Sequence, residues 1–307
     1  MYPFLRSHYQ TIVPNVFQRR PVTYRRERLE LDDGDFLDLD WKDHVERRLV
    51  VLSHGLEGDS RRAYVASAAN YFHNRGWNIL AWNCRSCSGE MNRTPKLYSH
   101  GQSDDLAAVV NHAVRSQRFD RIVLVGYSMG GNLTLKYLGT AGADVPEQIT
   151  HGVAFSAPCH IQYSADSLDR RGNYIYRRKF MKSLFAKISA KERQFPGRVD
   201  VARIKDVRAW RDFDRWFSAP ISGYDDLDAY YAYLSSANFV AGTRVPVLIC
   251  NAKNDPIVPP ACTPRELLSH PHIHIAEPEW GGHVGFGLRR GTGYNYMDVV
   301  AGEFFGF

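Results

Sequence analysis

Short runs of aliphatic and β-branched residues recur along the chain, each bounded by turn-forming residues. Five runs predict strands that are buried on both faces: 49–53, 78–82, 121–125, 152–155 and 245–249. Between most of them, apolar residues recur with helical spacing, at 64–72, 105–114 and 132–138. Strands that alternate with helices predict a mainly parallel, doubly wound sheet of the α/β class.

Two departures from this alternation define the expected organisation. Residues 22–31 and 35–41 alternate apolar with polar positions around Asp32-Asp33-Gly34, which predicts an antiparallel hairpin at the edge of the sheet. After Phe155 the chain becomes charged and aromatic, with helical stretches but no convincing buried strand. We therefore expect a core formed by residues 1–156 and 241–307, with residues 157–240 inserted as a helical cap.

Charge and composition narrow the classes of function. The net charge of +6 is local: residues 157–217 hold 15 Lys/Arg and 7 Asp/Glu, whereas the remainder carries about −2. No nucleic-acid motif accompanies this basic stretch, so we expect no nucleic-acid partner and interpret it as a solvated helical surface. Peripheral contact with anionic substrates or lipid headgroups is the alternative.

The ends and the cysteines of the chain point to a reducing compartment. No apolar run approaches the roughly 18 residues of a spanning helix, and the first 20 residues lack the apolar core of a signal peptide. We therefore expect a cytoplasmic protein without integral membrane association. The five cysteines are an odd, scattered set that predicts free thiols. Cys84 and Cys87 have the spacing of a redox or zinc pair, but no second pair completes a metal site, so we expect neither metal nor cofactor.

A candidate nucleophile follows the third buried run. Residues 126–130 read Gly-Tyr-Ser-Met-Gly and fit G-x-S-x-G, between a predicted strand and a predicted helix. A serine hydroxyl is a poor nucleophile unless a tight turn holds it within reach of a base. Ser128 is therefore the predicted nucleophile, and a serine here argues against dehalogenase and cysteine-based chemistry.

An acid and a base should follow in that order, each after a core strand. Asp255 lies just past the strand predicted at 245–249, where open α/β sheets bind ligands. His283 lies between glycines, in a loop after the strand predicted at 272–276. We predict Asp255 as the orienting acid and His283 as the general base.

Two backbone amides are expected to stabilise the oxyanion of an acyl transfer. The amide after the nucleophile belongs to Met129, and the glycine-rich segment 54–58 after an early strand offers the amide of Leu56. His54 comes too early in the chain order to be the base, so we interpret it as a residue that fixes this loop. Four aromatic residues of the cap are candidates for lining an acyl pocket, although any single one is better interpreted as core: Tyr174, Phe180, Trp210 and Trp216.

Over nearly its whole length the sequence resembles the YheT-type subfamily (AB hydrolase family 4) of the α/β hydrolases. The matching stretches are 8–12, 35–41, 54–58, 87–90, 126–132, 213–231 and 281–286. Residues 213–220, Phe-Asp-Arg-Trp-Phe-Ser-Ala-Pro, followed by Gly223-Tyr224, are far more specific than the serine motif. The sequence departs from the subfamily at Ser86, where glycine is usual, and at Tyr98-Ser99-His100-Gly101, where the order Tyr-His-Ser-Gly is usual.

The resemblance implies the α/β-hydrolase fold, the same Ser128, Asp255 and His283 as site residues, and carboxylesterase-like activity. Eukaryotic relatives have an N-terminal membrane anchor that is not expected here. We therefore expect a serine hydrolase that cleaves a small-molecule or lipid-like carboxylic ester through an acyl-enzyme. Two alternatives stay open: an acyltransferase that passes the acyl group to an alcohol, and a non-catalytic ligand-binding protein on the same fold.

Overall fold

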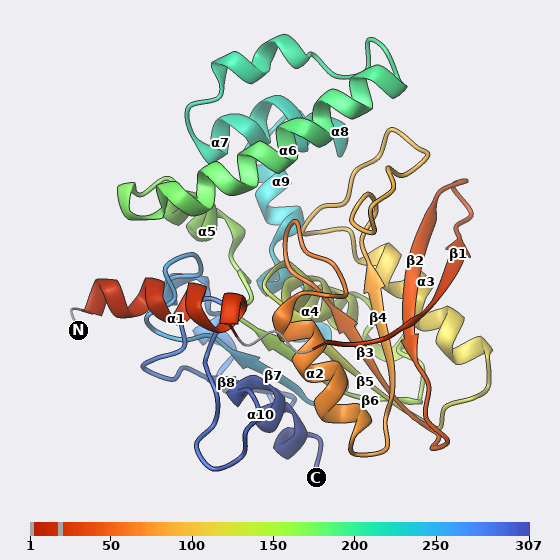
Figure 1. The fold of residues 1–307 in the computed structure, drawn as a ribbon. Coiled ribbons are helices and arrows are strands. Elements are labelled where there is room, and N and C mark those ends of the chain that lie inside the picture. The colour runs from red at the N-terminus through yellow and green to blue at the C-terminus, as the bar shows by residue number, and fades with distance from the viewer. Residues whose placement is uncertain (1–2, 18–20) are drawn as a thin grey trace.

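An eight-stranded sheet forms the centre of the molecule (Figure 1). The computed structural model describes residues 3–17 and 21–307. The strands lie in the order β1-β2-β4-β3-β5-β6-β7-β8, and only the pairings of β2 with β1 and β4 are antiparallel. Their bounds are β1 (Arg25–Glu30), β2 (Phe36–Lys42), β3 (Arg48–Ser53), β4 (Asn78–Asn83), β5 (Arg121–Tyr127), β6 (Ile149–Phe155), β7 (Val247–Cys250) and β8 (Ile273–Ala276). The predicted α/β sheet is confirmed.

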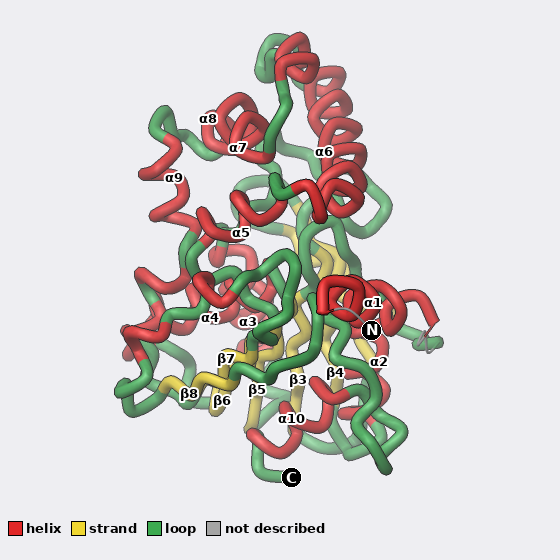
Figure 2. Tube along the Cα trace, turned by 90° about the vertical axis from the view of Figure 1, so that its left-hand side faces the viewer, coloured by secondary structure: helices red, strands yellow, loops and turns green. Residues whose placement is uncertain are grey.

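Helices cover both faces of the sheet, because successive side chains of a strand point to opposite faces. Leu49 and Val51 of β3 pack with α3 (Ser103–Arg115) and α4 (Met129–Ala141). Val50 and Leu52 pack on the other face with α2 (Ala63–His73) and α10 (Tyr296–Phe304). In the tube view the strands run between these two helical layers (Figure 2). The five aliphatic runs therefore coincide with strands that are buried on both sides, although the last strand begins at Val247 and not at Val245.

The chain between β6 and β7 rises above one end of the sheet (Figure 1). It contains α5 (Ile161–Leu168), α6 (Tyr174–Gln194), α7 (Trp210–Phe213), a π-helical turn (Asp214–Ser218), α8 (Ala219–Ile221) and α9 (Leu227–Leu234), and its residues include no strand. Its apolar side chains form a third hydrophobic cluster, which includes Leu184, Trp210 and Phe217. Ile257 and Val258, from the loop after β7, join that cluster and connect it to the sheet.

Two terminal helices were not among the predicted elements. One is α10, and the other is α1 (Pro3–Phe17), which lies beside the loops that follow β7 and β8 (Figure 1). Pro14 lies inside α1, where its missing N–H leaves the carbonyl of Gln10 without its usual helical partner. Gly285 packs directly on that carbonyl, since a Cβ at Gly285 would lie 1.8 Å from it.

Candidate active site

Ser128 lies at the sharp turn from β5 into α4. Its backbone has φ 55° and ψ −119°, a left-handed conformation that costs free energy for a residue with a side chain. Glycines make the turn fit: a Cβ at Gly126 would lie 2.2 Å from the oxygen of Gly130, and one at Gly130 would lie 2.2 Å from the oxygen of Ser53. The amide of Ser128 donates to the carbonyl of Phe155 on β6 at 2.8 Å. The turn therefore holds the serine clear of the sheet.

The structure brings Ser128, His283 and Asp255 together in one hydrogen-bonded chain. The Nε2 of His283 lies 2.9 Å from the Oγ of Ser128, and its Nδ1 lies 2.9 Å from Asp255 Oδ2. The other oxygen of Asp255 accepts the amides of Ile257 and Val258 at 2.8 and 2.9 Å, which fixes the carboxylate. An imidazole between a hydroxyl and a carboxylate can remove the hydroxyl proton and remain oriented while it is charged.

The His283 loop is held in place by residues far away in the sequence. Thr11 of α1 accepts the amide of His283 at 2.9 Å through its Oγ1 and donates to the carbonyl of Ser7. Asn254 accepts the amides of Gly281 and Gly282 at 2.9 and 3.0 Å. The sequence motifs alone do not indicate these supporting residues, although the matching stretch 8–12 contains Thr11.

The loop that holds Leu56 packs directly against the serine. A Cβ at Gly55 would lie 3.1 Å from the Cβ of Ser128. Within residues 3–17 and 21–307, the amide of Leu56 has no hydrogen-bond acceptor. Met129 is the first residue of α4, so its amide has no acceptor inside the helix. Both predicted amides are therefore near Ser128 and are not used by the helix or the loop.

His54 connects the loops after β3 and β4. Its Nε2 accepts the amide of Cys84 at 3.0 Å, so the proton is on Nδ1, which donates to the carbonyl of Gly55 at 2.8 Å. Complete burial lowers the pKa of His54 to about 4 and keeps it neutral. The ring thus supports the loop that carries Leu56. Both of its nitrogens bond to backbone groups, and neither of these bonds involves the hydroxyl of Ser128.

A mostly buried ion pair links the same loop to α6. The Nζ of Lys187 lies 2.7 Å from the carboxylate of Glu57, which also accepts the hydroxyls of Tyr98 and Ser183. Burial alone would raise the pKa of Glu57, but the Lys187 charge and these hydrogen bonds hold it below its ordinary value. Glu57 itself has φ 54° and follows Leu56 directly. From the sequence, Lys187 was expected only as part of a basic, solvated surface.

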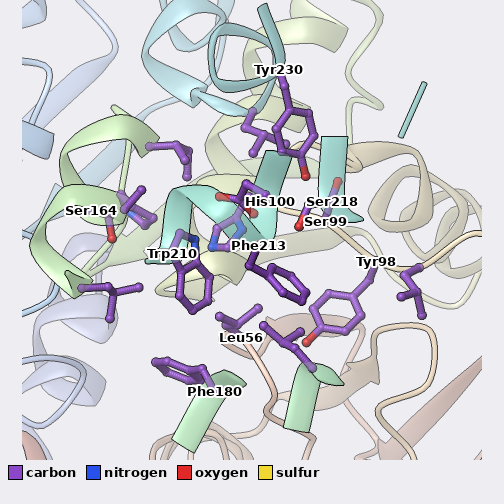
Figure 3. Close-up of a pocket in the computed structure, with 18 of the residues that line it drawn as sticks. Leu56, Tyr98, Ser99, His100, Ser164, Phe180, Trp210, Phe213, Ser218 and Tyr230 are labelled. Atoms are coloured by element: carbon purple, nitrogen blue, oxygen red, sulfur yellow. The ribbon is translucent and has the colours of Figure 1, made fainter. Parts of the chain in front are cut away.

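Ser128 and His283 line a cavity, and Figure 3 shows other side chains that form its wall. Apolar side chains of α5, α6 and α7 form much of its wall, and they include Leu168, Leu184 and Phe213. Of the four aromatic candidates, Phe180 and Trp210 line the cavity, whereas Tyr174 and Trp216 are exposed. The cavity could therefore hold an apolar chain next to the serine.

One part of the cavity wall is polar. Ser99, Ser218 and Tyr230 lie together in one region of Figure 3, and Asp214 also lines the cavity. Burial raises the pKa of Asp214 to about 6, although the hydroxyl of Tyr231 donates to it at 2.9 Å. Burial disfavours the charged form of His100 as well, which for a base lowers the pKa, here to about 4.

One of the two departures from the subfamily pattern lines this cavity, and the other lies in a separate hollow beside Glu57 and Lys187. His100 and Ser99, the exchanged pair, line the cavity, and the carbonyl of His100 accepts the side chain of Asn132 from α4. Ser86 has φ 60°, a conformation that favours glycine, and its hydroxyl pairs with Asn92. All five cysteines are free, and the described residues contain no group of three metal-ligating side chains.

None of the helices within the described ranges is long and apolar enough to cross a membrane. Helix α6 has 21 residues, a length that could span a membrane, but it is rich in charged residues.

Known proteins share both the sequence and the fold. The family model Hydrolase_4, described as serine aminopeptidase S33, matches residues 44–273. The Escherichia coli K12 protein named "Putative esterase YheT" is 33% identical over 291 residues, which cover 92% of this chain and 85% of that protein. Mouse phospholipase ABHD3 is 30% identical over 314 residues, covering 97% and 75%.

The solved structure of the Pyrococcus furiosus esterase Pf2001 superposes with a TM-score of 0.61 and 18% identity over 92% of this chain and 89% of that one. This likeness supports the fold, and the sequence matches support the family. The chain therefore belongs to the YheT-type (AB hydrolase family 4) branch of the α/β hydrolases, a family of serine hydrolases and esterases.

Proposed function

We propose that this protein hydrolyses carboxylic esters through an acyl-enzyme on Ser128, with His283 as general base and Asp255 as orienting acid. The hydrogen-bonded chain from Ser128 through His283 to Asp255 carries this proposal. His283 Nε2 takes the serine proton as Oγ bonds to the ester carbonyl carbon, and then gives it to the leaving alcohol. Water, deprotonated by His283, attacks the acyl group and releases the acid with Ser128 restored.

The amides of Leu56 and Met129 would stabilise the oxyanion of both tetrahedral intermediates. Both amides are near Ser128, and neither is used by a helical or loop hydrogen bond among the described residues. Removing one such donor in other enzymes costs about 100- to 1000-fold in kcat. Because backbone groups do this work, substitution of the Leu56 or Met129 side chain is expected to have smaller effects.

Residues 157–240 are the proposed cap, inserted into a core of residues 1–156 and 241–307. The apolar wall that this segment adds to the cavity supports an acyl chain as the bound group. The esterase and phospholipase names of the relatives agree with an ester, whereas the family description names an aminopeptidase. An apolar wall next to the serine favours the ester.

Labelling with a fluorophosphonate probe tests the nucleophile. We expect modification of Ser128 in the folded protein, none in Ser128→Ala, and none after heat unfolding. A panel of p-nitrophenyl esters and aminoacyl p-nitroanilides then tests the substrate class. Hydrolysis of the anilides but not of the esters would overturn the proposed activity, and an unlabelled Ser128 would overturn the mechanism.

A further inference from the structure

The outer face of α1 carries a stripe of exposed apolar side chains. Leu5, Tyr9, Ile12 and Val16 are 55%, 52%, 42% and 46% exposed. Their spacing of four, three and four residues places them on one side of the helix. Ser7, Thr11 and Pro14 are buried on the opposite side. A stable helix of a globular protein normally buries its apolar stripe, so this face is the reverse of the usual arrangement.

Further exposed apolar residues adjoin this helix. The hydroxyl of Tyr176 on α6 lies 2.9 Å from the Nδ1 of His8, and the two rings stack. This contact brings the start of α6, with Tyr174 and Ile175 exposed, beside α1 (Figure 1). The guanidinium of Arg6 lies 3.8 Å from the ring centre of Trp280, which is also partly exposed. Large exposed apolar patches mark interaction surfaces.

Positive charge surrounds the start of α6. The exposed basic side chains just before this helix and in its first turns include Arg170, Arg171, Arg178 and Lys182. The carboxylates just before this helix already form ion pairs with other arginines: Asp169 pairs with Arg177, and Asp166 pairs with Arg211. The two carboxylates near Trp280 also form ion pairs, Glu277 with Arg265 and Glu279 with Lys253. The free charge beside the apolar residues is therefore positive.

We propose that α1, Trp280 and the start of α6 form a docking surface for an anionic lipid membrane. An apolar helical stripe beside basic side chains matches a helix that lies in the plane of a lipid interface. The apolar residues would enter the boundary between headgroups and acyl chains, while the basic side chains meet anionic headgroups.

Docking through α1 would place the active site beside the lipid. The buried side of the same helix holds the His283 loop through Thr11 and through the packing of Gly285 on Gln10. The helix that meets the membrane is thus in contact with the loop that carries the proposed base. Membrane binding itself does not depend on the proposed hydrolysis, so the two can fail separately.

The test is flotation of the wild-type protein with vesicles of ether-linked lipids, which an esterase cannot degrade. Vesicles of equal parts phosphatidylcholine and phosphatidylglycerol are compared with phosphatidylcholine alone. We expect binding to the anionic vesicles and a loss of at least about tenfold in partitioning for the double variant Leu5→Ser, Ile12→Ser, because two apolar side chains leave the interface. Val45→Ser is the control, since Val45 is 91% exposed in the loop between β2 and β3.

The charge component is tested with Arg171→Ser, Arg178→Ser and with added salt. Both changes are expected to weaken binding to anionic vesicles, by about fivefold per arginine. Arg290→Ser removes an exposed arginine from another loop and serves as the control. Equal binding by the α1 variant and the wild type would overturn the proposal. Failure of the wild type to bind either kind of vesicle would also overturn it. If light scattering then shows a dimer that the double variant Leu5→Ser, Ile12→Ser converts to a monomer, the α1 face is an interface between two copies of the chain.

Discussion

At the scale of single residues, the ion pair between Glu57 and Lys187 bears most directly on the proposed chemistry. Glu57 directly follows Leu56 in the chain. Contacts that fix the Glu57 carboxylate therefore also restrict the position of the Leu56 amide. Glu57→Gln keeps the size of the side chain but removes the charge that pairs with Lys187 at 2.7 Å. We expect kcat on a soluble ester to fall about 10- to 100-fold with little change in KM, since the oxyanion forms after binding.

Two further variants separate this role from a loss of folding. Lys187→Arg preserves the pair and should retain most of kcat, whereas Lys187→Met should behave like Glu57→Gln. Lys253→Met breaks the surface pair with Glu279 and serves as the control. If Glu57→Gln raises KM and leaves kcat unchanged, Glu57 does not position the Leu56 amide for the oxyanion.

His54 should make the fold sensitive to acid. Its pKa is about 4 in the folded protein and 6.5 in an unfolded chain, so the unfolded state binds the extra proton first as the pH falls. The stability contributed by the neutral ring is complete above pH 6.5 and is lost between pH 6.5 and 4, by about 3 kcal/mol.

Urea unfolding across this pH range measures the effect. Between pH 6.5 and 4 the free energy of unfolding of His54→Gln should fall by about 3 kcal/mol less than that of the wild type, even if the variant is less stable at neutral pH. His274→Gln removes a histidine at the surface and is the matched control. An identical pH dependence in wild type and His54→Gln would show that the ring is not held neutral.

The residues that could be predicted from sequence are those whose signal is local. Ser128 lies within a five-residue motif, and Asp255 and His283 follow strands in a known order, so each could be assigned from its neighbours. Lys187 lies 130 residues from Glu57, and nothing in either neighbourhood indicates the contact. The strain at Ser86 shows the same limit, because its φ of 60° explains the usual glycine only once the backbone is known.

At the scale of elements, α1 is a support for the active site as well as an outer surface. Thr11→Val preserves shape but removes the acceptor of the His283 amide, leaving a buried N–H unpaired at a cost of about 1 to 3 kcal/mol. We expect kcat to fall about tenfold, because the His283 loop can move away from Ser128.

Thr11→Ser retains the hydroxyl and is expected to restore kcat to within about twofold of wild type. Steady-state kinetics on a soluble ester, with thermal unfolding of each variant, provide the measurement. If the valine and serine variants have equal kcat, the hydrogen bond to His283 has no part in placing the base.

The same helix shows why some elements escaped prediction. The strands were found because burial on both faces requires continuous aliphatic runs, as in 121–125, and this pattern is independent of the partner. In α1 the apolar positions do recur with helical spacing, but they face outward and Pro14 interrupts the hydrogen bonding, so the pattern does not indicate which side of the helix packs against the core. Its place is set by contacts with Gly285 and His283, more than 250 residues away.

At the scale of the whole molecule, the segment between β6 and β7 is fastened to the helix that carries the serine. Asn132 of α4 donates to the carbonyl of Leu234 at 2.8 Å and accepts the amide of Ser236 at 3.1 Å. The same side chain donates to the carbonyl of His100. The cavity is therefore enclosed by parts whose positions are fixed relative to Ser128, and its size should set the length of the acyl chain.

Ala165→Phe tests this relation between the cap and the substrate. Ala165 is a buried residue of α5 that lines the cavity, so a phenyl ring there would occupy space next to the acyl group. We expect the preferred ester to become shorter, with kcat/KM for the longest esters accepted by wild type falling at least about tenfold. Ala186→Phe places the same ring on the exposed side of α6 and should leave the chain-length profile unchanged. An equal loss for all chain lengths in Ala165→Phe would indicate damage to the fold, and an unchanged profile would place the acyl chain elsewhere.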